Sequence, residues 1–169
     1  MAIASARSWT ATWGRSPGRI DQMTLQKLIA TRAPGAVVLI RLAVGSVFLS
    51  EGIQKFLFPA ELAAGRFAKV GLPNPELLGP FVGAFEIACG AAVLLGLFTR
   101  LAAVPLIIIM LVALTTTKVP ILVNRGFWTM AHEARTDWSM LLGAIFLLVM
   151  GAGPWSLDRS LASRSAPRQ

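Results

Sequence analysis

The chain has 169 residues, enough for one domain; 55% of them are hydrophobic and only 14% are charged, against roughly 25% charged in a soluble domain. This composition excludes an ordinary water-soluble domain, because the polar groups are too few to cover its surface, and it predicts a protein that lies in lipid. The net charge of +8 does not indicate nucleic-acid binding. The basic residues lie in the termini and in short spacers between apolar runs, where membrane topology places them.

Residues 1–34 form a basic N-terminal tail without the apolar core of a signal peptide. The apolar residues of segment 20–30 recur at roughly helical spacing, which is compatible with an amphipathic helix on the membrane surface. Residues 1–19 are equally compatible with a disordered tail.

Four apolar runs follow the tail, each near the ~20 residues that a helix needs to cross hydrocarbon. Prolines and charged residues mark their ends. Only a short turn separates the second and third runs, so these two are expected to form an antiparallel hairpin. The predicted fold class is all-α, a polytopic membrane protein with a four-transmembrane-helix bundle in residues 35–158 and a basic C-terminal tail in 159–169. The predicted spans are 35–57, 77–97, 101–117 and 136–153.

The positions of lysine and arginine predict the orientation of the bundle. Nine of them lie in the two tails and in the turn between the second and third spans, against five in the other connections. The positive-inside rule therefore places both termini in the cytoplasm, with the bundle in a bacterial inner membrane. The two long connections, 58–76 and 118–135, are expected to face outward and to offer a surface for a ligand or partner.

Ionisable residues inside the spans are a functional signal, because each costs about 2.5–3.5 kcal/mol at a helix centre. In the first span, Lys55 lies about 40° and Glu51 about 80° around the helix axis from Arg41, so the three share one face. Glu51 and Lys55 are spaced i, i+4 in the order that favours an ion pair. Arg41 is equally compatible with a side chain that snorkels to the membrane surface.

The second span contributes Glu86. Gly79 and Gly83 form a G-x-x-x-G pair on the same face, which lets another helix approach closely and turns Glu86 into the bundle. At 1.5 Å per residue, Glu86 lies about 14 Å and Glu51 about 9 Å from the outer ends of their spans, so they are predicted to meet within one turn. This cluster is compatible with an ion-paired lock, with a proton-handling or quinone head-group site, and with a partner contact. The predicted buried polar cluster comprises Arg41, Glu51, Lys55 and Glu86.

The connection before the fourth span supplies three outer-loop candidates, His132, Glu133 and Asp137. His132 is the only histidine in the sequence, which excludes a haem held by two histidines of one chain. Three ligand-type residues in a loop give little support for a metal site, and none is predicted. Asp137 is equally compatible with a cap at the start of the fourth helix. The only cysteine, Cys89, excludes a disulfide within the chain.

Six segments occur in an order and at a spacing that carry a family resemblance: Arg41-Leu42, 48–56, 67–73, Glu86 in a Gly/Ala-rich run, 95–100 and 151–158. On the strength of these segments, the chain resembles the DoxX family of small four-helix bacterial membrane proteins. The resemblance covers about residues 36–161. The one departure is Gly-Ala-Gly-Pro-Trp at 151–155, where many members have Gly-Pro-Gly.

The resemblance implies a subunit of a membrane oxidoreductase, since the family is named for a subunit of an archaeal thiosulfate:quinone oxidoreductase. Quinone is then the candidate ligand. The sequence has no recognisable haem, flavin or Fe–S motif, so electrons would come from another membrane or redox protein. The alternative is a non-enzymatic assembly or scaffold subunit that self-associates or binds a partner through the G-x-x-x-G face, and whether the chain is an enzyme stays open. A transporter is disfavoured because no inverted repeat is present. The resemblance assigns no catalytic role to the polar cluster.

Overall fold

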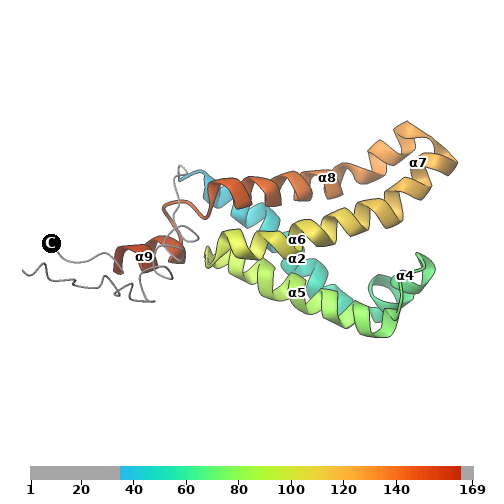
Figure 1. Cartoon of the computed structure of the whole chain (residues 1–169), viewed down its shortest axis with the longest axis horizontal. Helices are drawn as coiled ribbons and strands as arrows, with labels where there is room; N and C mark the ends of the chain where they lie inside the picture. The colour runs from blue at the N-terminus through green and yellow to red at the C-terminus, as the bar shows by residue number, and fades with distance from the viewer. Residues whose placement is uncertain (1–34, 165–169) are drawn as a thin grey trace, which may run out of the picture.

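The computed structural model describes residues 35–164, and the structural statements below concern that part of the chain. The predicted surface helix at 20–30 lies outside the described residues. The described chain is helical and contains no strand, which confirms the all-α prediction. Its long helices alternate in direction, so that residue 35 and the last helix, α9 (Leu157–Arg164), lie at the same end of the bundle (Figure 1).

Three helices are long and apolar enough to cross a membrane: α2 (Val37–Leu57), α5 (Pro75–Leu95) and the continuous stretch Thr99–Arg125. The fourth long helix, α8 (Phe127–Met150), has 24 residues, but its first half is polar. The predicted bundle of four helices is compatible with this arrangement, with α8 as the fourth member.

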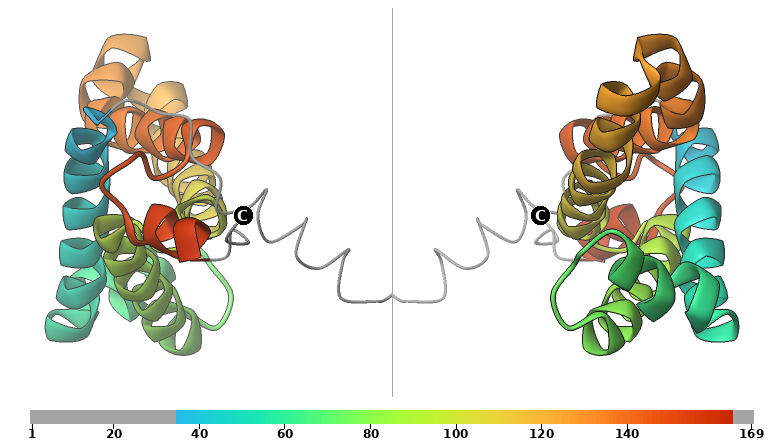
Figure 2. Two further views of the ribbon diagram at one scale, coloured as in Figure 1. Left: turned by 90° about the vertical axis from the view of Figure 1, so that its left-hand side faces the viewer. Right: turned by 90° about the vertical axis from the view of Figure 1, so that its right-hand side faces the viewer.

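The two long connections are largely helical, so the prediction of a loop at 118–135 is wrong. The first connection contains α3 (Pro59–Leu62) and α4 (Ala64–Lys69). The third span continues from α6 (Thr99–Ala113) through a π-helical turn, η1 (Leu114–Lys118), into α7 (Val119–Arg125). Only Gly126 separates α7 from α8, and its φ of +83° is a conformation that glycine adopts without steric cost. Figure 2 shows the end with α4 and α7 in its right panel and the end with α9 in its left panel.

The π-helical turn directly precedes a proline. Pro120 has no amide hydrogen, and its ring crowds the carbonyl four residues earlier, that of Thr116 in η1, which favours a local change of helix geometry. Pro80 and Pro105, by contrast, lie inside α5 and α6 without such a change. The three threonine hydroxyls of η1 donate to carbonyls of the preceding turn at 2.6–2.9 Å. The helix end predicted at 118–120 is therefore a change of helix type.

Glycines bring α2 and α5 into close contact. A Cβ atom on Gly52 would lie 2.7 Å from the carbonyl oxygen of Gly83, and one on Gly90 would lie 2.7 Å from the backbone nitrogen of Leu49. The close approach expected from the G-x-x-x-G pair thus occurs inside the chain. Gly83 packs on α2, and Gly79 packs on the junction of α3 and α4 at Ala63 and Ala64.

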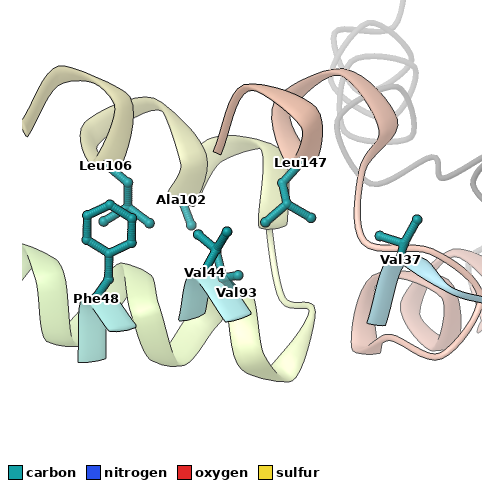
Figure 3. Close-up of a cluster of buried hydrophobic side chains, with 7 residues drawn as sticks. All are labelled: Val37, Val44, Phe48, Val93, Ala102, Leu106 and Leu147. Carbon is teal, nitrogen blue, oxygen red and sulfur yellow. The ribbon is translucent and has the colours of Figure 1, made fainter. Parts of the chain in front are cut away.

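The hydrophobic core lies towards the end of the bundle that holds the turn between α5 and α6. Figure 3 shows Phe48 beside Leu106, and Val44 near Val93 and Ala102. Buried residues of α6 end at Leu106. Beyond it, α6 and α5 diverge along their length (Figure 1). At that end of the bundle α4, η1 and α7 contribute no buried residue. The core consists of Val37, Val44, Phe48, Val93, Ala102, Leu106 and Leu147.

Candidate functional site

A cavity of about 670 Å³ lies in the loosely packed half of the bundle. Its walls come from α2, α5, α6 and α8, with α4 and the segment after it at one end. The volume falls within the roughly 300–1,000 Å³ of small-molecule sites. Most lining residues are apolar, and the ionisable ones are Glu51, Lys55, Arg66, Glu86 and Asp137.

An ion-paired lysine lies on the wall of this cavity. The Lys55 Nζ atom lies 2.6 Å from Glu86 Oε2 and 3.8 Å from Glu51 Oε2. The side chains of Lys55 and Glu86 are only 9% and 3% exposed, whereas that of Glu51 is 45% exposed. The i, i+4 spacing places Glu51 beside Lys55, and the contact between Gly52 and Gly83 brings α5 close enough for Glu86 to reach the same ammonium group. The structure thus brings together three of the four predicted cluster residues.

Asp137 lies on another wall of the same cavity. It pairs with Lys118 of η1, with 3.1 Å between Nζ and Oδ2. The interpretation of Asp137 as a helix cap is wrong, because α8 begins at Phe127 and Asp137 lies within it. Its neighbours among the outer-loop candidates lie elsewhere. Glu133 accepts a hydrogen bond of 3.2 Å from Arg125, and the Arg135 guanidinium contacts the His132 ring. Within residues 35–164, no three His, Cys, Asp or Glu side chains converge in a way that could hold a metal.

Sequence reasoning missed Arg66 as a residue of this site. Arg66 belongs to α4, lines the cavity and interacts electrostatically with Glu86. One feature of the sequence could have indicated Arg66: it directly precedes segment 67–73, which carries part of the family resemblance. The connection around it was expected to be a loop. Only the folding of that connection into α4 places the side chain over the cavity.

Arg41 does not belong to the cluster. It shares the angular position of Lys55 on α2 but lies about 21 Å away along the helix axis. The snorkelling interpretation is also wrong, because the side chain is buried. Its guanidinium donates to four backbone carbonyls. Val93 (2.9 Å) and Leu94 (2.6 Å) lie at the end of α5, and Ala152 (3.1 Å) and Trp155 (2.5 Å) lie in the segment between α8 and α9.

Asp158 completes this second polar site. Its carboxylate accepts hydrogen bonds from the backbone nitrogens of Phe98 (2.6 Å) and Thr99 (3.1 Å) at the start of α6. Its own amide donates to the carbonyl of Gly96 at 2.9 Å. Segments 95–100 and 151–158, which carry part of the family resemblance, therefore meet around Arg41. This site joins helix ends and borders no part of the cavity.

Comparison with known proteins supports the family. The DoxX family model matches residues 36–119, a range that contains Arg41, Glu51, Lys55 and Glu86. The chain is also 52% identical over 145 residues to "uncharacterized membrane protein Rv3486" of Mycobacterium tuberculosis, an alignment that covers 82% of this chain and 89% of that relative. No solved structure matches the chain. On these matches and on its apolar helices, the chain is a membrane protein of the DoxX family.

Proposed function

We propose that the protein is a subunit of a membrane oxidoreductase that holds a quinone head group in the cavity, beside Lys55 and Glu86. The observation that carries the proposal is a buried ion pair on the wall of a mostly apolar cavity within a membrane bundle. Intramembrane ionisable residues that face a cavity are typical of substrate and proton pathways. A planar ring with polar oxygens matches such a mixture of apolar walls and a few polar groups.

The residues of the cavity have distinct roles in this proposal. The Lys55 ammonium donates hydrogen bonds and binds the oxygen of a head group, while Glu86 holds the ammonium in place. Glu51, which is more exposed, exchanges protons with water and passes them to the buried pair. A bound quinone supplies two-electron, two-proton chemistry, and the electrons come from a partner redox protein.

The proposal includes a bacterial inner-membrane location with both termini in the cytoplasm. Its support is the excess of Lys and Arg on the side of the tails and the common end shared by residue 35 and α9. Trp128, at the start of α8, and Trp155, just before α9, are both exposed. The start of α8 and α9 lie at opposite ends of the bundle (Figure 1), which suits anchors at the two membrane interfaces. Cysteines introduced at Ser160 and at Asn124 should react with a membrane-impermeant maleimide from opposite sides of sealed inverted vesicles. Ser160 reacts from the cytoplasmic side if the proposal holds, and labelling from the other side refutes the orientation.

The test of the binding function is purification of the full chain in mild detergent, followed by mass spectrometry of co-purifying quinones and proteins. We expect quinone to co-purify with the wild type and to fall at least tenfold in Glu86→Gln. The matched control is Glu133→Gln, which changes a carboxylate of α8 that lies outside the cavity and should leave quinone unchanged.

A wild type that carries no quinone and binds no added benzoquinone would contradict the proposal. A reproducible membrane-protein partner without quinone would favour the assembly role instead. That role would need a surface other than the G-x-x-x-G face, because Gly79 and Gly83 are covered within the chain.

A further inference from the structure

The cavity has an apolar side between α5 and α6. Phe81 and Phe85 of α5 and Ile108 and Val112 of α6 line the cavity. All four are nevertheless exposed, by 57%, 41%, 56% and 43% respectively. Their side chains are therefore not covered by another helix of the described chain.

These four residues lie at matching levels on the two helices. α5 and α6 are antiparallel and joined by a tight turn, so residues equally far from the turn face each other. By this register, Phe85 lies within one residue of the level of Ile108, and Phe81 within one residue of the level of Val112. The helices have diverged at this level, since α6 contributes no buried residue after Leu106 (Figure 1). The rings of Phe81 and Phe85, 4.9 Å apart, form one edge of the resulting opening.

The opposite side of the cavity, between α2 and α8, has a different chemistry. Glu51 is 45% exposed there, and Thr136 is also exposed. A hydrocarbon chain would pass these polar groups at a cost, because it would displace the water that solvates them. An apolar group therefore fits the side between α5 and α6, and water fits the side between α2 and α8.

We propose that the ligand of this cavity carries a hydrocarbon tail, and that the tail leaves the protein between α5 and α6, past Phe81, Phe85, Ile108 and Val112, into the bilayer. The inference rests on the proposed head-group site at Lys55 and Glu86 and specifies the class of ligand: an amphiphile with a compact polar head and a long apolar tail. Such a ligand reaches the site laterally from lipid and never crosses the polar side.

The test uses two photoreactive probes on the full chain in lipid nanodiscs. The first is a benzoquinone with a ten-carbon tail that ends in a diazirine, and the second has the same tail on a benzene ring without the oxygens. Only labelling that excess non-photoreactive probe displaces is counted, which removes adventitious contact with lipid-facing surfaces. Peptide mass spectrometry then locates the adducts. We expect displaceable adducts of the benzoquinone probe on α5 and α6 around Phe85 and Ile108.

Matched variants test the route itself. Phe85→Trp adds bulk at the opening, whereas Phe146→Trp adds the same bulk at a similarly exposed site of α8 that does not line the cavity. Displaceable labelling should fall at least fivefold in Phe85→Trp and stay unchanged in Phe146→Trp. The pair Ile108→Trp and Ile145→Trp repeats this comparison on α6 and α8.

The outcomes separate this inference from the proposed function. Adducts from the benzoquinone probe alone support both the route and the quinone head group. Equal displaceable adducts from both probes support the route and overturn quinone as the preferred head. If the benzoquinone probe gives displaceable adducts on α2 or α8 instead, the head-group site is still supported, but the route between α5 and α6 is overturned. If neither probe gives displaceable adducts, the route is overturned.

Discussion

The two ends of the bundle both bury charge, but in different ways. At the end near α9, the guanidinium of Arg41 donates to four backbone carbonyls, and the Asp158 carboxylate accepts from two backbone amides. At the end near α4, Lys55 and Glu86 have mainly each other and face a cavity. A charge bound to backbone cannot change partner without breaking helix ends. A charge paired with another side chain beside open space can exchange that partner for a ligand. The first end therefore suits a role in stability, and the second end is where the proposed ligand would bind.

The largest expected effect comes from Arg41. Arg41→Leu should lower the free energy of unfolding by about 4 kcal/mol, because several carbonyls at the end of α5 and in the segment after α8 lose a charged donor in a buried place. Arg41→Lys should recover only part of this, since a single ammonium cannot reach oxygens in both segments. Unfolding by SDS in mixed micelles measures the change. Arg125→Leu, at an exposed arginine, is the control. A stable Arg41→Leu protein would remove the contrast between the two ends.

Glu86 comes next, and it separates stability from binding. Glu86→Leu alone should cost about 3 kcal/mol, because Lys55 is left buried with only the more distant Glu51. The double variant Lys55→Met with Glu86→Leu should return to within about 1 kcal/mol of the wild type, since replacing a buried pair by apolar groups is often neutral. Both variants should lose quinone. The same unfolding assay, combined with quinone content, checks this. A double variant that still binds quinone would assign the head group to other residues.

The contact between α2 and α5 is the third test. Gly52→Ala should cost about 2 kcal/mol, because the added Cβ would meet the Gly83 carbonyl oxygen at 2.7 Å and the helices must separate. The separation should also weaken quinone binding by pulling Glu86 away from Lys55. Gly35→Ala serves as the control, since the nearest atom to its Cβ is 4.0 Å away. If both variants unfold alike, the glycine contact does not position the ion pair.

The smallest expected effect is at Asp158. Asp158→Ala removes the acceptor for two amides at the start of α6 and should cost about 1 kcal/mol, the usual value for a lost helix cap. Quinone content should stay unchanged, because Asp158 lies outside the cavity. Thermal unfolding and quinone content of the same preparation provide the measurement. Loss of quinone in this variant would show that the two ends are coupled.

The sequence by itself determined the membrane class, the all-α fold and the family. Long apolar runs are local properties, and each indicates a helix whatever its neighbours do. The sequence also paired Glu51 with Lys55 and placed Glu86 opposite them, because angular position and depth follow from regular helix geometry. Helix rise also separates Arg41 from that cluster by about 21 Å along α2, so the shared face alone was a poor reason to group them. The sequence could not supply the backbone carbonyls that Arg41 contacts, because these come from two other parts of the fold.

The tertiary structure decided what the polar residues contact. The loop expected around Arg66 folds as α4, and the loop expected before Asp137 folds into α7 and the first turns of α8. Both side chains line the cavity in this arrangement. The glycine pair, which the alternative assembly role assigned to a partner, packs inside the chain, because the same close approach serves a helix of the same bundle. The cavity itself follows from the divergence of α5 and α6 after Leu106, and no residue pattern encodes such an angle locally. Composition and periodicity act along one helix, whereas cavities and polar partners depend on how several helices pack together.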